Sequence, residues 1–157
     1  METQIETVDV TVQTPRAVFC LLVRTALQHT TPVALVAEWA LRAAATFDQE
    51  RRHGCRFVFM DRNDRPVGSL PDHLGASDPP PRAEAIAFPL TREAARVLDD
   101  LARTSGRSTG AVLRSAALLL RDLLEARECG WTVQVLNAEG RVDGFLRDVV
   151  GRRATLH

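Results

Sequence analysis

The chain has no lysine and no net charge. All 20 of its cationic side chains are arginine, and 20 acidic side chains balance them. A protein that covers a long stretch of nucleic acid usually carries an excess of basic residues on its binding face. The balance therefore argues against a large nucleic-acid footprint and leaves only local groups of arginine to meet phosphates.

Long apolar runs and cysteines are scarce as well. No run approaches the ~18 consecutive apolar residues of a membrane-spanning helix, and the N-terminus lacks the basic-then-apolar pattern of a secretory signal. The three cysteines, Cys20, Cys55 and Cys129, share no metal-ligand spacing. This pattern favours reduced thiols that are buried or half-buried. We therefore expect a cytoplasmic protein with no membrane contact.

The motifs of catalysis are absent. The four histidines are scattered, and none stands at a recognisable spacing from a serine, cysteine or aspartate. The sequence contains neither a glycine-rich phosphate loop nor a set of four metal ligands. These absences predict a protein that is not an enzyme and that uses no cofactor and no metal.

What the sequence does contain is a repeat with an offset of 76 residues. Residues 54–61 align with 130–137, and residues 64–70 align with 140–146, without a gap. Identities are few, but the order of element types is the same in both halves. A duplicated unit decides how every other pattern in the chain is interpreted.

Hydrophobic periodicity predicts the same elements in each half, namely a strand, a helix, a longer helix and a hairpin. In the first half we expect them over 8–14, 16–29, 32–52 and 56–70, and in the second half over 86–90, 92–105, 108–129 and 132–146. Thr14, Thr91 and Ser108 are the expected helix caps, and Gly106 is an expected helix stop.

A proline-rich segment separates the halves. Residues 71–83 contain the run Pro79 to Pro81 and can span up to ~45 Å when extended, so they do not restrict how the halves dock. The predicted organisation is a first repeat over 1–70, a linker over 71–83 and a second repeat over 84–157.

The second repeat resembles the ribbon-helix-helix family, the MetJ/Arc/CopG class. The resemblance lies in the strand core, the spacing of the first helix, the helix stop and the serine that follows it, at Ile86, Phe88, Leu90, Ala94, Val97, Leu98, Leu101, Gly106 and Ser108. The first repeat is similar over the same stretch, with Thr30-Thr31-Pro32 in place of Gly106-Arg107-Ser108.

The resemblance implies an α+β fold in which two ribbon-helix-helix-like repeats form a pseudo-dimer, each with an added C-terminal β-hairpin. The strand near 8–14 would pair with the strand near 84–90. A single unit cannot bury its lone strand or its strongly apolar second helix, and joining two units makes their association intramolecular. The alternative is two unrelated small α+β modules on one linker.

The same resemblance implies that the ribbon enters the DNA major groove. By strand alternation, the base-reading residues would be Asp9, Thr11, Gln13, Ala85, Ala87 and Pro89. Gln13 can pair with adenine through two hydrogen bonds, whereas the two alanines and the proline offer only apolar contact. Phosphates would be met by helix starts and nearby arginines, at Thr30, Thr31, Arg82, Arg92, Arg107, Ser108 and Thr109.

Two functions stay open on these grounds. The first is a sequence-specific bacterial transcriptional regulator that binds double-stranded DNA and pairs with a second copy on adjacent half-sites. The second is a protein-interaction module that keeps the fold without binding DNA, with the hairpins as a partner surface. Gln13 and Thr11 favour the first function, while the neutral charge, Asp9 and the apolar second strand favour the second.

Overall fold

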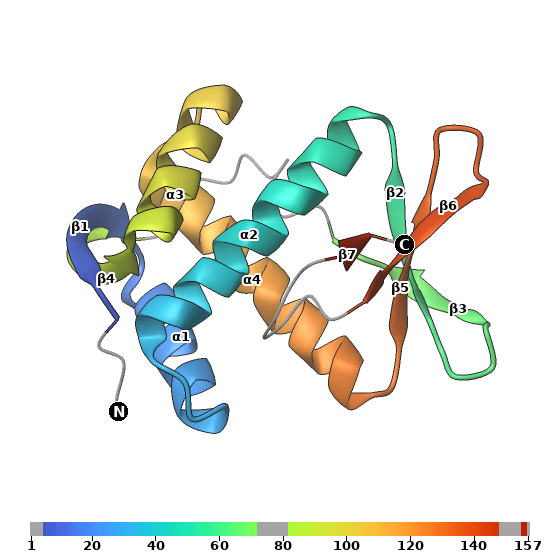
Figure 1. The fold of residues 1–157 in the computed structure, drawn as a ribbon, viewed down its shortest axis with the longest axis horizontal. Coiled ribbons are helices and arrows are strands. Elements are labelled where there is room, and N and C mark those ends of the chain that lie inside the picture. The colour runs from blue at the N-terminus through green and yellow to red at the C-terminus, as the bar shows by residue number, and fades with distance from the viewer. Residues whose placement is uncertain (1–4, 72–81, 148–154, 157) are drawn as a thin grey trace.

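The computed structural model describes residues 5–71, 82–147 and 155–156, and these form a mixed α+β chain. A two-stranded ribbon lies at one end of the long axis, the helices lie in the middle, and a five-stranded sheet lies at the other end (Figure 1). Most of the expected linker (72–81) and of the C-terminal tail lies outside the described residues. Within those residues, no single helix is long and apolar enough to cross a membrane.

Each half contributes the expected elements. The first half contains β1 (Thr7–Thr14), α1 (Arg16–Gln28), α2 (Val33–Arg52), β2 (Arg56–Met60) and β3 (Pro66–Ser69). The second half contains β4 (Glu84–Thr91), α3 (Arg92–Ser105), α4 (Thr109–Glu128), β5 (Thr132–Leu136) and β6 (Val142–Arg147), and the short β7 (Thr155–Leu156) follows. The bounds of α2 and α4, and those of β2 and β5, differ by the offset of 76 at both ends.

Two strand ladders join the halves, and both are centred on equivalent residues. In the ribbon, β1 runs antiparallel to β4 with Thr11 opposite Ala87, which confirms the predicted pairing. In the larger sheet, β2 runs antiparallel to β5 with Val58 opposite Gln134. Each central pair is separated by 76 residues. A two-fold axis between equivalent strands places equivalent residues opposite each other at the centre of the ladder. A two-fold rotation that exchanges the two halves therefore describes both ladders.

The hairpin turns repeat in detail. The Asp61 side chain accepts hydrogen bonds from the backbone amides two and four residues further on, at 2.8 and 3.0 Å. The Asn137 side chain makes the same two bonds at 3.1 and 2.9 Å. Asp and Asn side chains stabilise turns in this way, and each hairpin carries a register shift at the equivalent place, after Phe59 and after Val135.

The hairpins do not stand apart, because β2 and β5 join them into one sheet of order β3-β2-β5-β6-β7. Aromatic contacts fix this sheet to the helices. Phe57 lies 4.2 Å from Phe47 of α2 between ring centroids, and Phe59 lies 5.8 Å from Trp131 after α4. The sheet thus closes the helical core at the end opposite the ribbon.

The core draws on both halves at once. Phe19 of α1 contacts Phe88 of β4 edge to face at 5.3 Å. The large fully buried side chains come from both halves and include Leu22, Val36, Leu41, Phe88, Leu90, Leu98, Leu113 and Leu120. Removing either half would expose the apolar side chains that the other half covers.

One expectation about helix caps is wrong. Thr91 and Ser108 each accept a hydrogen bond from the amide three residues on, both at 3.1 Å. Thr14 does not cap α1: its hydroxyl is buried and has no partner among the described residues. The reason is that Pro15 occupies the position equivalent to Thr91, so Thr14 stands one residue too early. Pro32 likewise replaces Ser108, and neither proline supplies a side-chain cap.

Candidate nucleic-acid interface

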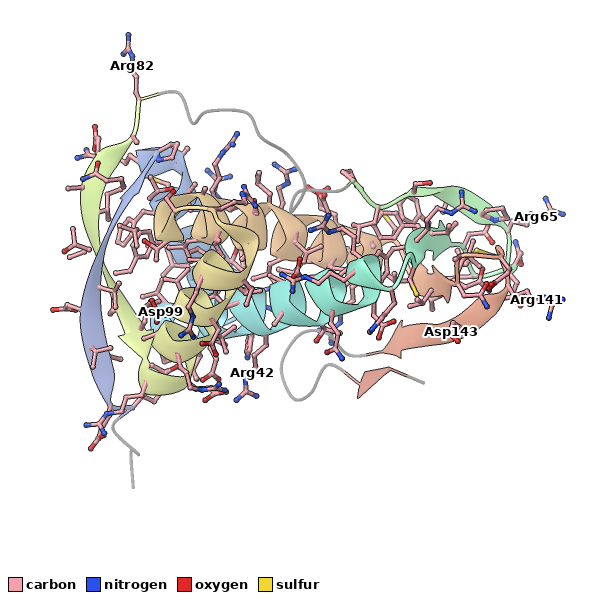
Figure 2. All side chains as sticks on the ribbon, turned by 90° about the horizontal axis from the view of Figure 1, so that it is seen from above. Arg42, Arg65, Arg82, Asp99, Arg141 and Asp143 are labelled. Atoms are coloured by element: carbon pink, nitrogen blue, oxygen red, sulfur yellow. The ribbon has the colours of Figure 1, made fainter. Side chains whose placement is uncertain are left out.

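The outer face of the ribbon consists of the six side chains that strand alternation predicted. They form three cross-strand pairs, Asp9 with Pro89, Thr11 with Ala87 and Gln13 with Ala85. All but the half-buried Pro89 are exposed. Figure 2 shows the ribbon at one extreme of the molecule, with side chains directed away from the helices. The inner face carries the buried Val12, Phe88 and Leu90, whereas Val8 near the ribbon end is 38% exposed.

The chemistry of this outer face is uneven. Every side chain with hydrogen-bonding capacity comes from β1, and β4 contributes two methyl groups and a proline ring. The two-fold axis passes between Thr11 and Ala87, so a polar half and an apolar half lie side by side. A ligand that reads both halves by hydrogen bonds would find donors and acceptors on one strand only.

Charges around the ribbon largely cancel. The Arg16 guanidinium lies 3.3 Å from the Glu84 carboxylate, and Arg92 lies 3.9 Å from Glu6. All four side chains are more than half exposed, so these pairs are weak and easily exchanged for other partners. Arg82 stands clear of the body at the start of β4 (Figure 2) and has a φ of 51°.

The start of α4 packs tightly on the ribbon. A Cβ at Gly110 would overlap the Gln13 carbonyl oxygen and would lie 2.7 Å from the carbonyl carbon. Glycine therefore permits the first turn of α4 to touch the β1 backbone. This contact brings the free amides at the helix start, beside Ser108 and Thr109, next to the polar strand of the ribbon.

The second turn of α2 contacts the end of the other strand. Thr91 at the end of β4 donates a hydrogen bond to Glu38 at 2.8 Å. Before this helix, Thr30 adopts a φ of 49°, and the Thr31 hydroxyl donates to the His29 carbonyl at 2.9 Å. The Thr31 hydroxyl is thus engaged within its own turn, and Pro32 supplies no amide at this helix start.

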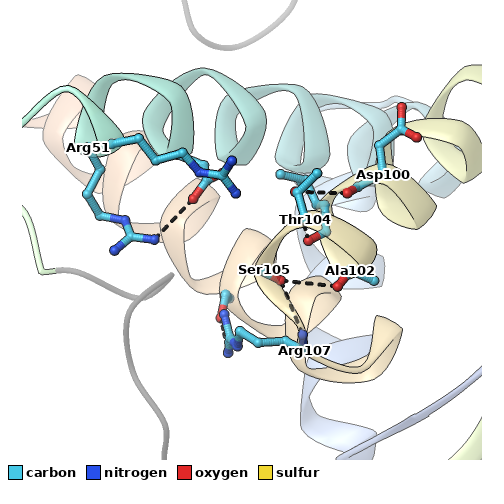
Figure 3. A network of polar contacts seen from close by, with 10 residues as sticks. Arg51, Asp100, Ala102, Thr104, Ser105 and Arg107 are labelled. Atoms are coloured by element: carbon cyan, nitrogen blue, oxygen red, sulfur yellow. Dashed lines mark hydrogen bonds and ion pairs between the residues drawn. The ribbon is translucent and has the colours of Figure 1, made fainter.

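Arg107, which was expected to meet phosphate, bonds within the protein instead. Its guanidinium donates to the Ser115 hydroxyl at 2.9 Å and to the Ala111 carbonyl at 3.4 Å. It lines a small recess with the buried Asp48 of α2, in the polar network of Figure 3. A backbone phosphate would have to displace these bonds, so the geometry gives Arg107 a structural role in holding α4.

A group of possible ligand atoms at the sheet end escaped the sequence analysis. Side-chain atoms of Glu50, Cys55 and Asp143 lie within 4.8 Å of one another. Burial raises the pKa of the Cys55 thiol above its usual 9.0, and the neighbouring carboxylates raise it further, so the thiol stays protonated. The other two thiols, Cys20 and Cys129, are exposed, contrary to the expectation of buried or half-buried cysteines. Sequence spacing missed this group because Asp143 comes from the other repeat.

No family model matches the sequence, and neither a curated protein nor a solved structure is similar to it.

Proposed function

We propose that this chain is a single-chain ribbon-helix-helix pseudo-dimer that binds double-stranded DNA through the β1/β4 ribbon and regulates transcription. The observation that carries the proposal is the ribbon itself: two antiparallel strands, centred on equivalent residues, exposed at one end of the molecule. The major groove of B-DNA admits a two-stranded ribbon and presents a distinct donor and acceptor pattern for each base pair.

The helix starts support the same interpretation. The start of α4 lies beside β1 through Gly110 against Gln13, and the second turn of α2 contacts the end of β4 through Glu38 against Thr91. Free amides at a helix start attract phosphate oxygens. In this proposal Ser108 and Thr109 lie near one DNA backbone and Thr30 and Thr31 near the other. Arg82 and Arg92 add cationic charge at the ribbon ends.

The uneven outer face gives the proposal a specific form. Thr11 and Gln13 read bases, with Asp9 at the ribbon end, whereas Ala85, Ala87 and Pro89 contact thymine methyl groups or none. One chain would then specify one half of its site strongly and the other half weakly. A second copy on an adjacent site would supply the remaining specificity.

Gln13 offers the sharpest test. We expect Gln13→Ala to weaken binding to a selected duplex by about 1–3 kcal/mol, the discrimination that a two-bond contact with adenine supplies, and to leave binding to random duplex unchanged. Titration of both duplexes by fluorescence anisotropy measures the ratio. Gln28→Ala, an exposed glutamine at the end of α1, is the matched control. An unchanged ratio would remove Gln13 from the reading face.

The charge balance around the ribbon favours a second candidate, a protein-interaction module that binds no DNA. Asp9 and the Arg16–Glu84 and Arg92–Glu6 pairs leave the ribbon without a net positive field. Titration of random duplex at two salt concentrations separates the candidates, because each neutralised phosphate contributes about −0.9 to the log–log salt slope. We expect the slope that corresponds to on the order of four to six neutralised phosphates per chain. A flat titration at low salt with folded protein would retire DNA binding.

A further inference from the structure

A cleft between α1 and α4 belongs to neither the ribbon face nor the sheet. Its volume is about 460 Å³. Val18 and Leu21 from α1 and Leu118 from α4 supply apolar walls, and three arginines, Arg24, Arg114 and Arg121, are also part of the lining. An exposed apolar cleft often marks a binding surface. Charges of one sign around it favour a ligand of the opposite sign.

Two of the three arginines of this cleft have no acidic partner in the part of the chain that the structure describes. Among the described residues, neither Arg24 nor Arg114 forms a hydrogen bond or an ion pair, and Arg121 lies 3.2 Å from the neighbouring Asp122. Two guanidinium groups on facing helices are thus available to an anionic partner.

The equivalent face, between α3 of the second half and α2 of the first, carries charged side chains that are paired within the protein. Asp100 stands where Arg24 stands, and Glu38 stands where Arg114 stands. Both carboxylates are engaged: Arg96 lies 3.3 Å from Asp100, and Thr91 donates to Glu38 at 2.8 Å.

Apolar positions of the cleft are charged on that equivalent face. Ala17 corresponds to Glu93 and Leu118 to Arg42, and Glu93 pairs with Arg96 at 2.6 Å. Arg42 projects from that side of the helices in Figure 2. The α3/α2 face therefore pairs its charges within the protein, whereas the α1/α4 cleft keeps apolar side chains beside two arginines that have no partner among the described residues.

The apolar side chains that α1 contributes to the cleft continue past it as a strip that ends at Leu27. Leu27 is 76% exposed, the most exposed of the large apolar side chains in the described residues, and lies one turn beyond Arg24. From Ala17 to Leu27 the strip runs about 15 Å along the helix. That length corresponds to about three turns of a second helix laid alongside.

We propose that the cleft between α1 and α4 binds an acidic amphipathic helix of a partner protein. Apolar side chains at helical spacing would enter between Leu21 and Leu118, which is how amphipathic helices occupy hydrophobic grooves. Glutamates or aspartates beside them would face Arg24 and Arg114. This surface shares no residue with the outer face of the ribbon, so it operates whatever the ribbon binds.

The test uses the full chain and two labelled peptides of about 18 residues, a length that forms helix with suitable residues. Both carry leucines at helical spacing, one with flanking glutamates and the other with flanking lysines. We expect anisotropy to show binding of the glutamate peptide alone. Combining Arg24→Glu with Arg114→Glu should weaken it at least about tenfold, since like charges then face each other. Arg65→Glu with Arg141→Glu, at the hairpin turns far from the cleft (Figure 2), is the matched control and should change little.

A second readout locates the peptide. Cys20 lines the cleft and is exposed, while Cys55 is buried. In a Cys129→Ser background, we expect the glutamate peptide to slow maleimide modification of Cys20 in proportion to its occupancy. Equal binding of the lysine peptide, undiminished binding to the doubly reversed variant, or modification of Cys20 at the free rate under saturation would each overturn the proposal. So would self-association of the chain that the double reversal abolishes, because the occupant would then be a second copy.

Discussion

The two halves share the length of the second helix, the turn geometry and the strand register, yet their helix starts and their surface residues differ. In the second half, Thr91 and Ser108 cap the helices, whereas prolines stand at both equivalent positions in the first half. An N-cap hydrogen bond contributes ~1 kcal/mol. The second half thus has the better-formed local structure, and the first half holds the polar ribbon strand and the α1 side of the cleft.

This difference teaches which positions the two halves share and which positions differ between them. The positions that couple the halves are held in register, as the ladder centres at Thr11/Ala87 and Val58/Gln134 show. Several surface positions on α1 and α3 differ, with Arg24 facing a cleft and Asp100 holding an ion pair. Covalent linkage permits this, because each half needs to fit only its own partner.

The largest effect should come from separating the halves. We expect residues 1–71 alone and 82–157 alone to show no cooperative thermal transition as monomers, because each would lose both strand partners and half of the core. Mixed in equal amounts, the fragments should recover the circular dichroism of the intact chain and should melt cooperatively at a lower, concentration-dependent temperature. A monomeric 82–157 fragment that melts cooperatively would show that the repeats are independent modules.

The second largest effect on stability is expected at the close contact between the start of α4 and β1. Gly110→Ala should destabilise the protein by about 3 kcal/mol or more, since the new methyl group meets backbone atoms of Gln13 rather than a flexible side chain. The equivalent residue in α2 is Ala34, and Ala34→Gly should cost only about 1 kcal/mol. Urea unfolding of both variants measures the difference. Similar losses would mean that the two helix starts are packed alike.

A smaller effect is expected at the turn between the helices of each half. Gly106 adopts a φ of 69° with open space where a side chain would stand, and Thr30 adopts 49° at the same place. A β-branched residue is strained when its φ is positive. Thr30→Gly should therefore stabilise by about 0.5–1 kcal/mol, and Gly106→Thr should destabilise by about 1–2 kcal/mol. Denaturant midpoints with unchanged slopes would measure both, and a destabilising Thr30→Gly would contradict the strain.

The smallest effect concerns alkaline pH and Cys55, whose equivalent in the second half is Trp131. Because the pKa of the folded thiol is raised above 9.0, the unfolded chain loses the proton first. The stabilisation that the protonated Cys55 thiol contributes is full below pH 9.0. It declines as the pH rises through the pKa of the thiol in the folded protein. The chain has no lysine and no tyrosine, so few other groups titrate between about pH 8 and 11. Cys55→Ala should flatten the decline, and the exposed Cys129→Ala should not; pH-dependent urea midpoints would measure both.

Much of the local structure was predictable. Periodicity located the helices, the strands and the two hairpins, and in the structure the Asp61 and Asn137 side chains stabilise the hairpin turns by bonding their own backbone. The pairing of β1 with β4 followed from the repeat and from the family resemblance. The cap at Thr14 was predicted wrongly. A threonine followed by proline looks like a helix cap in the sequence, but Pro15 occupies the N-cap position and Thr14 stands one residue before it.

The candidate site was predictable only in part. Strand alternation identified the exposed residues of the ribbon, since successive side chains point to opposite faces. The inward turn of Arg107 toward Ser115 could not be foreseen, because it depends on where Ser115 lies two helical turns away and on the recess formed with α2. The ion pairs that neutralise Arg16 and Arg92 depend on residues brought near only by folding.

The sequence by itself determined the duplication, the order of elements and the face that each strand turns outward, because these follow from spacing and from chemistry between near neighbours. Tertiary structure alone decided that the hairpins join through β2 and β5, that Gly110 touches Gln13, and that α1 and α4 leave a cleft lined by Arg24 and Arg114. Each of these is a contact between residues far apart along the chain, and the energy of such a contact depends on how both halves pack together.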